Sequence, residues 1–292
     1  MNILVTGGTG TVGSHVVNEL ARQRVSAKVL TRDLKKARAL PVAISAVEGN
    51  LLDVSSVRRV FEGVDAVFLL NAVAQTEASE GLMALTQMRV AGVKRVVYNS
   101  VHQVESAAYL PHFGSKIGIE AAIKRSGIAY TILRPNNFYQ NDYWFKDVVL
   151  QHGVYPQPMG SVGLSRVDVR DIAEAAVIAL TSSAHEGETY DLVGPAEVTG
   201  ASTAKVWSNV LGRPVVYGGD DLDAWEKVQL QYLPDWMVFD FKEMYRHFQQ
   251  AGLKASPQAI ERQSALLGHA PRDFETFAAE TARAWTSSPT DA

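Results

Sequence analysis

The sequence predicts an α/β protein: a Rossmann-type doubly wound parallel sheet, followed by a smaller and mostly helical C-terminal region. Three observations support this fold class. Short apolar runs alternate with segments of helical period over residues 1–135, as in a parallel sheet with helices on both faces. A glycine-rich turn follows the first apolar run directly. Beyond Pro135 the alternation weakens and helical segments predominate, so a second region is expected there.

The first sixteen residues combine a strand, a glycine turn and a helix. Residues 2–6 form an apolar run typical of a buried strand, and from Val16 onward the apolar positions follow a helical period. Glycines let a backbone approach a pyrophosphate closely, and free N–H groups at a helix start favour an anion. The turn therefore predicts a dinucleotide site, formed by Thr6, Gly7, Gly8, Thr9, Gly10, Thr11, Val12 and Gly13.

Further strands and helices are expected in order along the first region. Each expected strand is a short apolar run, and 65–70 is nearly all apolar, as in a strand buried on both faces. Asp33 is expected to cap a short helix, because its carboxylate can accept from the first free N–H groups. The expected strands are 2–6, 26–32, 42–47, 65–70, 94–99 and 129–133, and the helices after the first are 33–40, 54–61, 79–91 and 109–126.

A return to the sheet is expected after Pro135, together with a smaller region. A helix over 168–180 and a strand over 189–193 indicate that 164–194 rejoins the dinucleotide-binding domain, 1–135. The smaller substrate-binding region is expected over 136–163 and 195–286, with a short strand at 215–217 and helices including 236–250 and 273–285. The polar residues 287–292 are expected to form a disordered tail.

Composition excludes several classes of function. The chain has 292 residues, 47% of them hydrophobic, a formal charge of −3 and no cysteine. This charge gives no reason to expect nucleic acid as a partner, and no disulfide or thiolate chemistry is possible. No apolar run approaches the roughly 20 residues of a membrane span, and no signal peptide is expected. No metal site is expected either, because the histidines lack ligand spacing. We expect a cytoplasmic monomer or homodimer that acts on a small molecule.

Three blocks of residues resemble a known family. The turn over 6–13 resembles the Thr-Gly-x-x-Gly-x-x-Gly motif of extended and atypical short-chain dehydrogenases. The middle of the chain is similar to the NmrA-like branch, as is 266–285 near the C-terminus. That branch includes NADPH-dependent reductases of quinones and triphenylmethane dyes, and redox-sensing regulators that bind dinucleotide without turnover. The middle block consists of Phe113-Gly114-Ser115-Lys116, Glu120, 126–135, Phe138 and Asn141.

The end of the second strand favours NADP over NAD as the cofactor. NAD-preferring proteins hold an acidic residue there, against the ribose 2′-hydroxyl. Here the matching place is held by Arg32, with Lys35 and Lys36 close behind. A guanidinium offers paired donors to a phosphate. Asp33 lies one place later and is interpreted as a helix cap; the alternative for Arg32 is an ordinary surface charge.

Other cofactor contacts are predicted by position. Asp53 matches the family position beside the adenine, although it could also cap the next helix. Ser100 follows the fifth strand and could face the nicotinamide or serve as a structural hydroxyl. The remaining predicted cofactor residues are Asn71, Ala72, Lys116, Pro135 and Asn137.

The predicted catalytic residues depart from the family pattern. Classical short-chain dehydrogenases place a Tyr four residues before a Lys, whereas this chain keeps Lys116 and has His112 in the place of the Tyr. The resemblance implies that Lys116 contacts the ribose and substrate. His112 is a candidate proton donor, because imidazole titrates near neutral pH. Solvent is an alternative proton source, and the competing side chains are His102, Tyr109, Tyr139 and Tyr143.

A segment rich in aromatic and amide side chains follows the sixth strand. Ligands of open α/β sheets bind outside the carboxyl ends of the strands. A planar conjugated or aromatic acceptor is therefore expected, such as a quinone, enone, imine or dye, reduced by hydride from NADPH. The alternatives are core packing for each ring and, for the whole protein, a non-catalytic NADP(H)-sensing regulator. The predicted substrate-binding residues are Phe138, Tyr139, Asn141, Tyr143 and Trp144.

Overall fold

The computed structural model describes residues 1–287, which divide into two units. The first unit contains Met1–Pro135, Val169–Leu192 and Arg262–His269, and the second contains Asn136–Asp168, Val193–Glu261 and the chain from Ala270 onward. Apart from Ser287, the tail expected over 287–292 lies outside the described residues. Within residues 1–287, no helix is long and apolar enough to cross a membrane.

The first unit is built on a seven-stranded sheet with every neighbouring pair parallel. The strand order is β3-β2-β1-β4-β5-β6-β8, so the winding direction reverses between β1 and β4. Open α/β sheets bind ligands at such a reversal. The strands are β1 (Ile3–Val5), β2 (Ala27–Thr31), β3 (Ile44–Glu48), β4 (Ala66–Leu69), β5 (Arg95–Asn99), β6 (Ala129–Pro135) and β8 (Glu188–Leu192). The predicted fold class is confirmed.

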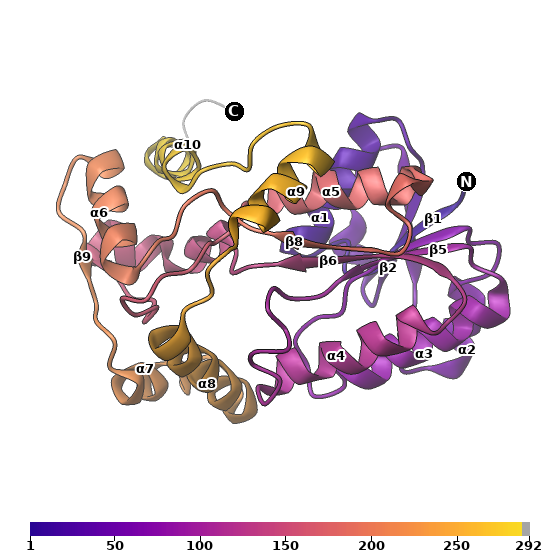
Figure 1. Cartoon of the computed structure of the whole chain (residues 1–292), viewed down its shortest axis with the longest axis horizontal. Coiled ribbons are helices and arrows are strands. Elements are labelled where there is room, and N and C mark those ends of the chain that lie inside the picture. Colours follow the sequence, from indigo (N-terminus) through magenta and orange to yellow (C-terminus); the bar gives the residue numbers. More distant parts are fainter. Residues whose placement is uncertain (288–292) are drawn as a thin grey trace. The chain divides into compact units, whose positions relative to one another are not determined.

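Helices cover both faces of this sheet (Figure 1). One face carries α1 (Thr11–Arg22) and α5 (Val169–Thr181), and the other carries α2 (Val54–Val60), α3 (Glu77–Ala91) and α4 (Pro111–Lys124). Every residue of β4 is buried, as expected for a strand covered on both faces. Side chains of the sheet and of α2, α3 and α4 form one continuous apolar core, which fixes the carboxyl ends of the strands relative to these helices.

The second unit is mostly helical, with one short parallel pair of strands, β7 (Val154–Tyr155) and β9 (Val216–Tyr217). The strand expected at 215–217 is present, but β7 was not predicted, because two residues give no periodic signal. Its core contains Trp207, Phe274 and Phe277. The short helices η1 (Leu34–Ala37), η2 (Tyr139–Phe145), η3 (Val148–His152) and η4 (Ser183–His185) and the helices α6 (Gly200–Leu211), α7 (Leu222–Gln229), α8 (Asp235–Ala251), α9 (Pro257–Leu267) and α10 (Phe274–Thr286) complete the described chain.

Candidate functional site

The turn between β1 and α1 is shaped around glycine. Gly7 has a φ of +65°, a left-handed conformation that favours a residue without a Cβ. A Cβ built on Gly13 would lie 2.1 Å from the carbonyl oxygen of Gly7, so the first turn of α1 packs directly against the loop backbone. The Gly10 N–H closes the loop on the Gly7 carbonyl at 2.9 Å. A side chain at Gly13 would open this turn.

The N-terminus of α1 is left uncapped by side chains. Gly10 occupies the capping position, and the first turn contains no acidic residue. The amide groups of such a turn, together with the helix dipole, attract an anion. The loop backbone at Thr9, Gly10 and Thr11 is exposed. This glycine turn therefore fits the diphosphate of a dinucleotide.

The hydroxyl of Thr6 connects this loop to the end of β4. It donates to the Leu70 carbonyl and accepts from the Leu70 N–H, both at 2.8 Å. Just beyond lies Asn71, which is 5% exposed, and neither atom of its amide group has a hydrogen-bond partner within residues 1–287. Buried polar groups are nearly always paired, so the Asn71 amide is a place where a ligand could bind. Ala72 is exposed.

Arg32 and Asp33, at the end of β2, have different roles. The Asp33 carboxylate accepts from the Lys35 N–H at 2.9 Å and caps η1, as predicted. Arg32 is exposed, and no described residue pairs with its guanidinium. The neighbouring Lys35 and Lys36 are also exposed. Arg32 is therefore accessible to a phosphate, while the acidic side chain beside it is engaged in the helix cap.

Asp53 caps α2, and this cap is compatible with the other predicted role of Asp53, a contact with the adenine. Its Oδ2 accepts from the Ser56 N–H and from the Ser55 hydroxyl, each at 2.8 Å. The hydrogen bond from Ser55, followed by that from the Ser56 backbone, holds the pKa of the exposed Asp53 carboxyl below its usual value. The cap is a structural fact, and the contact with adenine remains a prediction.

Ser100 belongs to a buried ionic network at the end of β5. Its hydroxyl donates to Glu120 Oε1 at 2.5 Å, and Arg134 donates to both oxygens of the same carboxylate at 2.9 and 2.6 Å. Burial opposes ionisation of Glu120, but the hydrogen bonds from Arg134 and Ser100 outweigh it and lower the pKa of Glu120. These bonds favour the structural interpretation of the Ser100 hydroxyl; a contact with the nicotinamide remains a prediction.

Lys116 and His112 lie one turn apart on α4, and both side chains are buried. The Lys116 ammonium contacts the carboxylate of Glu77, on α3. Glu77 is only 1% exposed. Burial raises its pKa, although Lys116 acts in the opposite direction. The His112 ring stands edge-on to Phe113, with the ring centroids 4.8 Å apart.

Sequence reasoning missed Glu77. The expected helix began at residue 79, whereas α3 begins at Glu77, so this acidic side chain was assigned to a loop. A glutamate in a first helical turn is normally explained by the helix dipole alone. No local signal shows that its partner lies 39 residues later in the chain.

The competing proton donors differ strongly in exposure. His102 is 3% exposed, and its Nδ1 lies 3.0 Å from Asp191 Oδ1 on β8. Tyr109 is 66% exposed. Tyr139 is buried in the second unit and donates to the Arg272 carbonyl at 3.2 Å. That contact favours packing over proton transfer for Tyr139.

The other predicted substrate residues also belong to the second unit. Tyr143 and Trp144 are exposed, while Phe138 and Asn141 are half-buried. Of the predicted cofactor residues, Pro135 ends β6 in the first unit and Asn137 lies in the second. The Asn137 side-chain oxygen accepts from Arg166 Nε at 3.0 Å.

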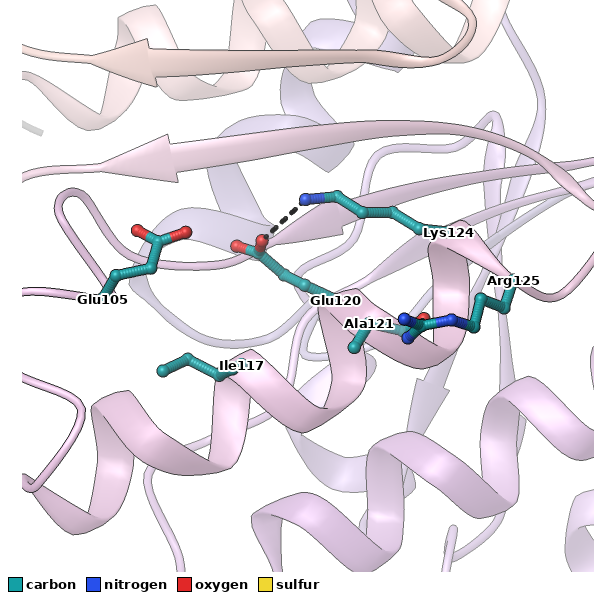
Figure 2. Close-up of a pocket in the computed structure, with 6 residues that line it drawn as sticks. All are labelled: Glu105, Ile117, Glu120, Ala121, Lys124 and Arg125. Atoms are coloured by element: carbon teal, nitrogen blue, oxygen red, sulfur yellow. Dashed lines mark hydrogen bonds and ion pairs between the residues drawn. The ribbon is translucent and has the colours of Figure 1, made fainter.

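A pocket lies beside α4, and Figure 2 shows the Glu120 carboxylate there, facing the Lys124 ammonium. Lys124 Nζ donates to Glu120 Oε2 at 3.5 Å. None of the pocket's lining residues was a predicted site residue. The pocket therefore adds a charged surface depression next to the Ser100 network and does not coincide with the glycine turn. Its lining residues are Glu105, Ile117, Glu120, Ala121, Lys124 and Arg125.

One grouping of possible metal ligands was not foreseen from the sequence. Ligand atoms of Asp171, Glu174 and His269 lie within 4.8 Å of one another. His269 Nε2 lies 2.7 Å from Glu174 Oε2, so a hydrogen-bonded imidazole–carboxylate pair accounts for most of this arrangement. We assign no metal to it.

Comparison with known proteins identifies the family. The NmrA-like family model matches residues 1–278, and the chain belongs to this family. It is 34% identical to the NAD(P)H azoreductase of Xenophilus azovorans over 74% of this chain and 76% of that protein. It is 30% identical to the (4-alkanoyl-5-oxo-2,5-dihydrofuran-3-yl)methyl phosphate reductase of Streptomyces griseus over 97% and 99%.

The fold has a close counterpart among solved structures. The NADPH-dependent quinone oxidoreductase QOR2 of Escherichia coli, solved with NADPH, superposes with a TM-score of 0.84. The alignment covers 96% of this chain and 99% of that one, at 23% sequence identity. The family model that matches residues 1–278 confirms the resemblance to the NmrA-like branch inferred from residues 6–13 and 113–141.

Proposed function

We propose that this protein is an NADPH-dependent reductase that reduces a planar, conjugated or aromatic acceptor of the quinone, enone, imine or dye type. The glycine turn carries the proposal, because its backbone leaves no room for a Cβ at Gly13 and its helix start is open to an anion. Membership of the NmrA-like family and two relatives named as reductases support it.

Different residues of the first unit would bind different parts of the cofactor. The backbone of 7–13 would bind the diphosphate, Arg32 the 2′-phosphate, and Asp53 would lie beside the adenine. Lys116 would donate to the ribose hydroxyls. When bound, NADPH supplies the hydride.

The proton required after hydride transfer has two candidate sources. His112 is buried one turn from Lys116, and a histidine side chain within reach of the acceptor can act as a general acid. Water is the other source, because a quinone or dye can be protonated after the hydride has arrived. The exposed rings of Tyr143 and Trp144 would contribute an aromatic surface for a flat acceptor.

The test is NADPH oxidation, followed by absorbance, with a panel of quinones, enones, imines and azo or triphenylmethane dyes. Turnover of at least one class with NADPH, and slower turnover with NADH, supports the proposal. Tight NADPH binding without turnover of any acceptor would contradict it and would favour a cofactor-sensing regulator. A His112→Gln variant then distinguishes the two proton sources. If His112 donates the proton, the loss of rate in the variant should depend on the basicity of the acceptor. If water donates it, the loss of rate should not depend on the acceptor.

A further inference from the structure

Glu77 lies on the buried face of α3, and the other buried residues of that face are small or apolar. The buried positions of α3 are Glu77, Gly81, Ala84, Leu85 and Met88, one stripe at helical spacing. A glutamate in a first turn gains from the helix dipole without being buried. Burying a charged group is costly unless it is paired and hydrogen-bonded. Its burial therefore requires an explanation other than helix stability.

The partner of Glu77 is the predicted cofactor lysine. Glu77 Oε1 accepts from Lys116 Nζ, and both side chains are buried. One turn further along α3, a Cβ built on Gly81 would lie 2.5 Å from Ile119 Cδ1, on α4. The missing side chain thus lets α3 and α4 approach closely. This close packing brings the carboxylate within contact distance of the ammonium.

The second oxygen of Glu77 accepts no hydrogen bond from any described residue, although the nearby Ser115, on α4, helps to lower the pKa of this carboxyl group. Within residues 1–287, Oε2 of Glu77 and both atoms of the Asn71 amide are buried without a hydrogen-bond partner. The Asn71 oxygen lies 3.3 Å from the Cβ position built on Gly81, so it faces the same stripe of α3 as Glu77. Unpaired buried polar groups are rare in folded proteins. Two such groups along one stripe of α3 indicate a place that a hydroxyl or a water fills.

We propose that Glu77 is a positioning residue: it holds the Lys116 ammonium for the cofactor, and its second oxygen and the Asn71 amide, both facing the same stripe of α3, bind a hydroxyl. This inference rests on the proposed function only in taking NADPH as the ligand. It does not require turnover. Glu77 acts through Lys116, so its contribution to binding must disappear when the ammonium is removed.

The first experiment measures NADPH dissociation constants of the full chain by calorimetry, without an acceptor. Glu77→Gln keeps the size of the side chain and removes its charge, and we expect it to weaken NADPH binding about tenfold, which corresponds to about 1.4 kcal/mol. Glu80→Gln is the matched control. Glu80 lies on the same helix, is half-exposed, and accepts from the Thr76 hydroxyl at 3.0 Å. We expect its affinity to stay within about twofold of the wild type.

A double-mutant cycle tests whether Glu77 acts through Lys116. In the Lys116→Met background, Glu77→Gln should cost no further affinity, because no ammonium remains to be positioned. The same loss in both backgrounds would overturn the proposal and assign Glu77 a direct or purely structural role. Equal NADPH affinity of the wild type and Glu77→Gln would also overturn it. Circular dichroism verifies folding. Should Glu77→Gln unfold, Glu77→Asp replaces it, because the shorter side chain withdraws the carboxylate from Lys116 and should weaken NADPH binding in the wild-type background alone.

A second readout needs neither cofactor nor activity. Trace acetic anhydride labels neutral amines, and the acetylation of Lys116 can be compared with that of exposed Lys124 in the same sample by peptide mass spectrometry. Glu77→Gln removes the ion pair that holds the Lys116 ammonium, so we expect the Lys116 to Lys124 labelling ratio to rise severalfold. An unchanged ratio would contradict the coupling. Normal NADPH binding without turnover would instead defeat the proposed function and leave this inference intact.

Discussion

Gly13 shows how one absent side chain defines the candidate cofactor site. Its position in the first turn of α1 follows from the sequence alone, because glycines at this spacing after a strand and before a helix mark a dinucleotide-binding turn. The structure gives the reason for glycine in atomic terms: the Cβ would meet the Gly7 carbonyl rather than a flexible side chain. A backbone group cannot move aside without opening the loop.

Replacing Gly13 by Ala should therefore weaken both folding and cofactor binding. We expect the free energy of unfolding to fall by about 1–3 kcal/mol, as for other overpacked sites, and NADPH affinity to fall at least tenfold. Gly118→Ala is the control, since nothing lies within 4 Å of a Cβ there and the residue is in α4. That change should stabilise the helix by about 0.5–1 kcal/mol. Urea denaturation and calorimetry measure both effects, and equal behaviour of the two variants would disprove this account.

Arg32 allows a direct test of the cofactor preference. We expect Arg32→Ala to raise the dissociation constant of NADPH about tenfold or more, because one charged hydrogen-bonding partner of the phosphate is lost. The dissociation constant of NADH should change little. Lys28→Ala, at an exposed position earlier on β2, controls for the loss of a positive charge. Equal losses for the two nucleotides would show that Arg32 does not read the 2′-phosphate.

At the scale of elements, the sequence predicted helices and strands best where a segment has a regular pattern of apolar residues. The apolar runs predicted the strands of the large sheet, and Asp33 was correctly interpreted as a cap. Partners distant in the chain could not be predicted, such as Glu77 with Lys116 or Ser100 with Glu120. Their pairing depends on how α3, α4 and β5 pack, and no single segment encodes that packing.

The network at the end of β5 should make stability depend on acid pH through Glu120. Its lowered pKa means that the unfolded chain binds more protons than the folded chain as the pH falls below about 5. The stabilising contribution is complete above the unfolded value near 4.5 and is lost as the pH falls through the lower, folded value.

Glu120→Gln should lower the free energy of unfolding at pH 7 by about 1–3 kcal/mol, the value of hydrogen bonds to a charged group. It should also make stability fall less steeply between about pH 5 and pH 3. Glu105 provides the control, because its carboxylate also contacts Arg134 but is 65% exposed, and such pairs contribute little. Urea titrations at several pH values measure this, and parallel curves for the wild type and Glu120→Gln would contradict the assignment.

At the scale of the whole molecule, the two units differ in what the sequence could say about them. The first unit follows a repeating strand–helix order. In the second, residues 136–145 were interpreted as a substrate-facing segment, yet Tyr139, Gln140 and Asp142 are buried. Their partners lie more than twenty residues later in the chain: the Arg166 guanidinium donates to Asp142 at 2.7 Å, and Gln140 donates to Asp168 at 2.9 Å. A segment rich in polar and aromatic residues can therefore form either a substrate-binding site or part of a buried core.

Asp142 should be the most sensitive charge of the second unit. Its carboxylate accepts from Arg166 at 2.7 Å, from the Tyr155 hydroxyl at 3.0 Å and from Trp207 Nε1 at 2.9 Å, and every partner is fully buried. Asp142→Asn leaves the Arg166 guanidinium without a counter-charge, which costs about 3–5 kcal/mol in comparable buried pairs. Asp235→Asn, at an exposed helix start, should cost less than about 1 kcal/mol.

Thermal unfolding with and without NADPH extends this prediction to the whole chain. If the two units unfold as one cooperative structure, Asp142→Asn lowers a single transition and NADPH raises it, because a ligand stabilises whatever unfolds with its site. If they unfold separately, the substitution lowers one transition while NADPH raises the other, since the glycine turn lies in the first unit. Calorimetric scans of the wild type and Asp142→Asn distinguish these outcomes. Full stability of Asp142→Asn would contradict the ionic role of Asp142, because an amide cannot neutralise a buried guanidinium.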